Sequence, residues 1–113
     1  MKILQLIEEY NFVRSYEVVS FKKWDTGFYH NIRIDIRDGT CLYAREYVDE
    51  QQRNYSYHWQ DPGQSLLARW DNSPHHKNIV TFPHHRHTRD DKIIESREIT
   101  LKEILEYIKE SLE

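Results

Sequence analysis

Disulfides, long apolar runs and an excess of one kind of charge are all missing from this sequence. Its 113 residues include one cysteine, Cys41, so no internal disulfide can form, as is typical of proteins in a reducing compartment. No apolar run approaches the roughly 18–20 residues of a membrane-spanning helix, and no basic and apolar leader is visible. We therefore expect a cytoplasmic protein that does not enter a membrane.

The composition instead predicts one folded domain. Hydrophobic residues make up 38% and aromatic residues 13%, which is too many for a disordered chain. The length suits a single domain, residues 1–113, with one modest core. The formal net charge of −3 is not typical of nucleic-acid-binding domains, which commonly carry a basic face. The oligomeric state is left open, a homo-oligomer included.

Alternating apolar and polar residues predict an antiparallel sheet. Strands are expected at residues 12–24, 30–37, 40–48, 55–60 and 65–71. Asp38-Gly39, between the second and third strands, predicts a two-residue type I′ turn with positive φ at both residues. Shorter strand-like segments follow at residues 79–82, inside a long loop, and at residues 92–96.

One helix is predicted near each end of the chain. Residues 2–10 place apolar side chains at helical spacing. Thr100 and Glu103 form a capping-box pattern, and an apolar stripe follows it. That stripe consists of Leu101, Ile104, Leu105, Ile108 and Leu112. The fold class predicted is α+β, with an antiparallel β-meander of about five strands and both helices packed on one face.

The segment from Arg69 to His87 stands apart from these patterns. It holds five of the seven histidines of the chain and two of its three prolines. Pro-His-His occurs in it twice, at residues 74–76 and 83–85, and His87 follows the second copy. No hydrophobic periodicity requires this arrangement, so packing alone does not explain it.

The same segment carries a resemblance to a known family. Arg69-Trp70-Asp71-Asn72, the two Pro-His-His triplets and the preceding residues 55–61 resemble the TumE family of toxins from prokaryotic toxin–antitoxin systems. The resemblance implies a toxin that a cognate antitoxin with a helix-turn-helix inhibits. It implies no particular reaction.

The residues themselves leave three interpretations open, and a metal site is the first. His85 and His87 would lie on the same side of an extended segment. With His75 or His76 they offer three nitrogens to one zinc and leave a position for water. The spacing matches no standard zinc pattern, however, so no cofactor is required, and zinc or another divalent metal is left open.

A metal-free ribonuclease is the second interpretation. Cleavage of RNA through its own 2′-hydroxyl needs a base, an acid and a cation at the phosphate, which histidine and arginine can supply. Arg69 or Arg86 would hold the phosphate, and Asp71 would orient a histidine. Four aromatic residues could stack on bases, but their strand positions favour packing in the core: Tyr55, Tyr57, Trp59 and Trp70.

The third interpretation is structural or non-enzymatic. Proline followed by paired histidines can form a rigid turn whose imidazoles cap backbone groups, or a shaped surface that binds a protein or a metal. We expect function to concentrate in the motif positions and on the preceding strand. The candidate catalytic residues are His58, Arg69, Asp71, Asn72, His75, His76, His84, His85 and His87. RNA is the expected substrate if the protein is an enzyme.

Overall fold

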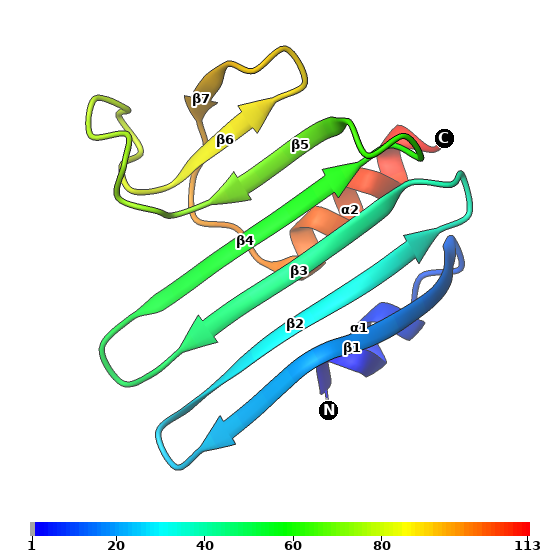
Figure 1. Ribbon diagram of the computed structural model, residues 1–113, viewed down its shortest axis with the longest axis horizontal. Coiled ribbons are helices and arrows are strands. Elements are labelled where there is room, and N and C mark those ends of the chain that lie inside the picture. The colour runs from blue at the N-terminus through cyan, green and yellow to red at the C-terminus, as the bar shows by residue number, and fades with distance from the viewer. Residues whose placement is uncertain (1) are drawn as a thin grey trace.

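The computed structural model describes residues 2–113 as one antiparallel sheet with two helices behind it (Figure 1). The elements are α1 (Lys2–Glu8), β1 (Val13–Trp24), β2 (Gly27–Ile36), β3 (Cys41–Val48), β4 (Arg53–Gln60), β5 (Leu66–Asp71), β6 (His85–Thr88), β7 (Ile93–Glu95) and α2 (Leu101–Ser111). Each strand pairs with the next, in the order β1 to β7. The predicted α+β class and the antiparallel meander are therefore confirmed. No helix within residues 2–113 has the length and apolar character needed to cross a membrane.

The sheet has seven strands, where the sequence predicted about five. β7 lies within the short strand expected at residues 92–96, whereas β6 falls in a segment expected to be a loop. The strand expected at residues 79–82 is wrong. That segment turns, with hydrogen bonds from Phe82 N to Ile79 O and from His84 N to Thr81 O, both 2.9 Å. Val80 is 83% exposed, so burial does not hold this segment in an extended form.

The connection between β2 and β3 also differs from the predicted type I′ turn. Gly39 has a φ of 90°, but Asp38 is not among the residues with positive φ in the described part of the chain. The Asp38 carboxylate instead accepts hydrogen bonds from Thr40 N (2.9 Å) and Thr40 Oγ1 (2.6 Å). These two hydrogen bonds stabilise the turn, so Asp38 does not need the left-handed conformation.

The core lies between the helices and one face of the sheet. Ile7 of α1 and four residues of the predicted stripe belong to a single buried cluster with alternate residues of β2 to β5. The fifth stripe residue, Leu112, follows the end of α2 and is 38% exposed, so it does not take part in this packing. The sheet members are Ile32, Ile34, Ile36, Leu42, Ala44, Tyr55, Tyr57, Trp59, Ala68 and Trp70. The predicted capping box of Thr100 and Glu103 begins α2.

Side chains alternate across a strand, so the intervening residues form the opposite face of the sheet. We call this surface, which carries no helix and lies toward the viewer in Figure 1, the open face.

Candidate functional site

The open face is polar and slightly hollowed. One hollow, of about 350 Å³, is lined by side chains from four neighbouring strands. They are Asn31, Tyr43, Arg45, Ser56, His58, Gln60 and Arg69. A second hollow, of about 420 Å³, shares Arg45 and Ser56 with the first and extends from Tyr29 and Tyr47 to Asp71. The two hollows therefore form one surface of arginine, tyrosine and amide groups that ends at Asp71.

Asp71 lies among three imidazoles, and we call Asp71, His76, His85 and His87 the histidine cluster. The β5–β6 register sets Asp71 opposite His85, so His85 and His87 project from the same side of β6, as predicted. Asp71 Oδ1 lies 2.9 Å from His85 Nε2, and Asp71 Oδ2 lies 3.4 Å from His87 Nε2. His76 reaches the cluster from the loop, and its ring centroid is 4.7 Å from that of His85.

The Asp71 carboxylate is buried but well supplied with donors. Ser73 N (3.0 Å) and Ser73 Oγ (2.9 Å) donate to Oδ1, and Arg69 Nε (3.0 Å) donates to Oδ2. Burial alone would raise the pKa of Asp71, but the hydrogen bonds from Ser73 and Arg69 outweigh it and lower the pKa below its ordinary value. Asp71 therefore carries a negative charge at neutral pH.

Two histidines of the site are held in their neutral form. Burial lowers the pKa of His87 below its ordinary value, and the nearby Asp71 charge does not compensate fully. Burial, together with the positive charge of Arg69, also lowers the pKa of His58. The His58 Nδ1 atom lies 3.5 Å from a guanidinium nitrogen of Arg69. Each neutral imidazole keeps one nitrogen lone pair that can accept a proton or bind a metal.

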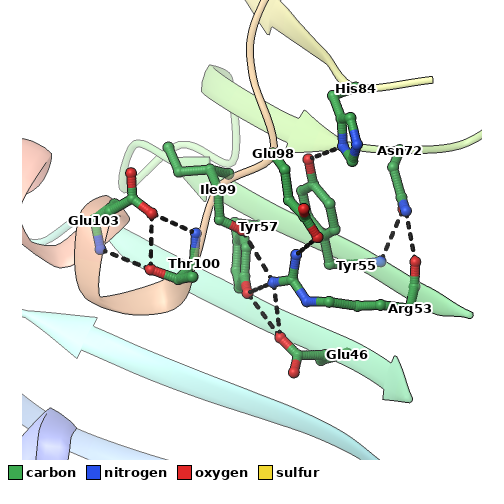
Figure 2. A network of polar contacts seen from close by, with 10 residues as sticks. All are labelled: Glu46, Arg53, Tyr55, Tyr57, Asn72, His84, Glu98, Ile99, Thr100 and Glu103. Atoms are coloured by element: carbon green, nitrogen blue, oxygen red, sulfur yellow. Dashed lines mark hydrogen bonds and ion pairs between the residues drawn. The ribbon is translucent and has the colours of Figure 1, made fainter. Parts of the chain in front are cut away.

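Six of the nine predicted site residues therefore come together, and three do not. The six are His58, Arg69, Asp71, His76, His85 and His87. The His75 side chain is exposed beside the cluster. Asn72 bridges backbone groups of β4, since its Oδ1 accepts from Tyr55 N (2.9 Å) and its Nδ2 donates to Arg53 O (2.6 Å) (Figure 2).

His84 belongs to the other face of the sheet. Its ring stacks on Tyr55 at 5.8 Å, and its Nδ1 lies 2.8 Å from the Tyr55 hydroxyl (Figure 2). Figure 2 also shows Arg53 in the same region, where it binds Glu46, Glu98, the Tyr57 hydroxyl and the carbonyl of Ile99. This network connects β4 with the segment that leads into α2. His84 packs on Tyr55 of the same strand, away from the open face.

Two further sets of residues lie away from the open face. Arg86, the alternative to Arg69 as the phosphate-binding residue, packs its guanidinium over Trp70 and Tyr107 and donates to the Tyr107 hydroxyl at 2.7 Å. The four aromatic residues considered for base stacking are buried in the core, the position that their strand pattern favoured. They are Tyr55, Tyr57, Trp59 and Trp70. The tyrosines of the open face are Tyr29, Tyr43 and Tyr47 instead.

The family model described as Toxin TumE matches residues 3–112 of the chain. The chain belongs to the TumE toxin family. The resemblance found in the histidine segment thus extends over nearly the whole chain, from α1 through α2. No curated protein and no solved structure matches this TumE-family chain.

Sequence reasoning missed some residues that shape this TumE-family site. Ser73 lies between two motif residues and holds the Asp71 carboxylate with two hydrogen bonds. Serine two residues after aspartate is a common turn pattern, and this is the signal that could have indicated it. Tyr43 and Arg45 lie on the open face of β3, and the register of β3 with β4 sets Tyr43 opposite His58, which the sequence alone did not indicate.

Proposed function

We propose that this TumE-family protein is the toxin of a two-component toxin–antitoxin module and that it cleaves RNA on its open face. One observation carries the proposal. His58 and Arg69 lie opposite each other on β4 and β5, with the histidine cluster on one side and half-buried tyrosines on the other. Base, phosphate-binding and base-stacking groups thus share one surface.

The arrangement suits cleavage through the 2′-hydroxyl of RNA. Neutral His58 takes the 2′-hydroxyl proton, and the resulting oxygen attacks the adjacent phosphorus atom. The bond from phosphorus to the 5′ oxygen breaks, leaving a 2′,3′-cyclic phosphate. The leaving 5′ oxygen takes a proton from water to become a hydroxyl, and His58 returns its proton to the solvent. Arg69 binds the phosphate oxygens, for which its guanidinium is well shaped. The histidine cluster stabilises the charge that develops on the leaving 5′ oxygen.

Single-stranded RNA fits this surface better than a duplex does. Tyrosine side chains stack on unpaired bases at about 1–3 kcal/mol per base, and they do so with little dependence on sequence. Tyr29 and Tyr47 line one hollow and Tyr43 the other, while Arg45 belongs to both. Arg45 would neutralise the backbone between stacked bases.

The partner that we propose is a cognate antitoxin that carries a helix-turn-helix, as the family membership suggests. An inhibitor of an RNA-cleaving surface must cover it or block access to it. We therefore expect RNA and antitoxin to compete for the protein.

The test is cleavage of total cellular RNA by purified tag-free protein. We expect fragments with cyclic phosphate ends, and we expect His58→Ala to abolish them while circular dichroism stays unchanged. His75→Ala is the matched control, because it removes an exposed imidazole of the same segment that lies outside the cluster. Intact RNA with the wild-type protein, or equal losses in both variants, would contradict the proposal.

A further inference from the structure

We propose that Asp71, His76, His85 and His87 bind one divalent first-row transition metal ion, with zinc as the reference ion. The inference deepens the proposed function, on which the use of the metal in RNA cleavage rests, but metal binding itself requires no RNA. One ligand atom from each of the three histidines lies within 4.8 Å of the other two. Asp71 lies against His85 and His87.

The position of the two His85 ring nitrogens is the first argument. Nδ1 lies 2.9 Å from the carbonyl oxygen of Pro83, which can only accept a hydrogen bond, so Nδ1 is the donor in that contact. Nε2 lies on the other side of the ring, 2.9 Å from Asp71 Oδ1 and 3.1 Å from His87 Nε2. Three possible ligand atoms therefore converge on one point, where a single metal ion can be held.

The distances between these atoms suit a metal. Zinc–nitrogen bonds of about 2.0–2.1 Å at tetrahedral angles place neighbouring ligand atoms about 3.3 Å apart. The three pairs formed by Asp71, His85 and His87 measure 2.9, 3.1 and 3.4 Å. The β5–β6 register fixes these three ligands, and only His76 comes from a loop. The sheet therefore sets most of the geometry, and the loop supplies the last nitrogen.

The groups around the ligands are those that metal sites require. A metal-bound histidine usually donates its other N–H to a carbonyl or carboxylate, as His85 donates to Pro83 O. Bound carboxylates are likewise hydrogen-bonded, as Asp71 is to Ser73 and Arg69. Three imidazoles and one carboxylate favour zinc and its neighbours over magnesium or calcium, which prefer oxygen ligands. The chemical class of the ion follows from this set.

Such an ion would act at the end of the open face. Asp71 lines the hollow that also contains Arg45 and Tyr47, so a cation at Asp71 borders the surface proposed for RNA. A divalent ion there stabilises negative charge on a phosphate or leaving oxygen without supplying a proton. This gives the histidine cluster a specific role beside His58.

The experiment measures zinc binding by the full-length, tag-free protein. The chelator-treated protein is titrated with zinc chloride by calorimetry, and bound metal is counted by elemental analysis after gel filtration. We expect one zinc per chain, and tetrahedral cobalt absorption when cobalt replaces zinc. His76→Ala and His87→Ala should weaken zinc binding at least about tenfold, since losing even a partner of a ligand costs roughly 10–100-fold.

His75→Ala is the matched control, because His75 is the exposed neighbour of His76 and lies outside the cluster. It should bind zinc as the wild type does. No zinc binding by the wild type, or equal weakening in His75→Ala and His76→Ala, would overturn the metal site. Zinc binding without RNA cleavage would support the site and overturn the proposed function. RNA cleavage by a protein that binds no zinc would support the proposed function and overturn the metal site.

Discussion

His58 is the residue on which the proposed chemistry depends most directly. Its imidazole lies opposite Tyr43 on β3 and Arg69 on β5. Burial is the largest cause that lowers its pKa, and Arg69 lowers it further. A base is useful only while it is unprotonated, so the lowered pKa keeps His58 ready at neutral pH.

The pH dependence of cleavage follows from that shift. We expect the rate to rise with pH through a value below the ordinary 6.5 of histidine and to level off near neutrality. Arg69→Gln removes a positive neighbour, so the pKa of His58 and the rising limb should move to higher pH. The measurement is the pH profile of kcat/KM for a short RNA. A limb that moves to lower pH in Arg69→Gln would contradict the assignment of His58 as the base.

Asn72 illustrates a motif residue with a structural task. Both polar atoms of its amide bind the backbone of β4. Asn72→Ala leaves Tyr55 N and Arg53 O without these partners, so we expect the free energy of unfolding to fall by about 1–3 kcal/mol. Urea denaturation measures this loss. Cleavage per folded molecule should stay close to that of the wild type, and a large drop in kcat would show instead that Asn72 acts in the reaction.

At the scale of elements, the strands that sequence could predict are those with an apolar face. β2 alternates Ile32, Ile34 and Ile36 with polar residues, and all three isoleucines are fully buried. β6 has no such signal, because the residue that faces the helices is Arg86 and the residues that face the open side are His85 and His87. Pairing with β5 and contact with Asp71 make it a strand. The missed strand is therefore the one that completes the site.

Helix α2, unlike β6, could be predicted from the sequence, because its apolar residues recur at helical spacing and pack in the core. Ile104 is 0% exposed and lies in the core cluster, while Lys102 is exposed on the same helix. Ile104→Ala removes buried carbons and leaves a cavity, so it should lower the free energy of unfolding by about 2–5 kcal/mol. Lys102→Ala, the control, should change it by less than about 0.5 kcal/mol. Equal effects in urea denaturation would contradict the arrangement of α2.

In the molecule as a whole, the two faces of the sheet have different roles. The face toward the helices holds the core, and the open face holds His58, the histidine cluster and the two hollows described above. The sequence alone predicted this division within each strand. It predicted the order of the strands but not the register that sets Tyr43 opposite His58. It favoured packing over base stacking for Tyr55, Tyr57, Trp59 and Trp70, and all four are core residues.

A measurement of RNA affinity tests whether RNA binds on the open face. In a His58→Ala background that does not cleave, Arg45→Ala should weaken binding of a single-stranded RNA. It should also reduce the slope of log affinity against log salt by about 0.7, the value for one phosphate contact on a single strand. Arg45 is exposed and borders both hollows, which is why it is the best single reporter.

The control for this change is Lys102→Ala, which removes the same charge from the helix side of the molecule. Both variants alter the net charge equally, so any general electrostatic attraction of RNA falls by a similar amount in each. Only a contact at the open face separates them. If Lys102→Ala lowered the salt slope as much as Arg45→Ala, RNA would not be bound on the open face, and the site beside His58 would have to serve another substrate.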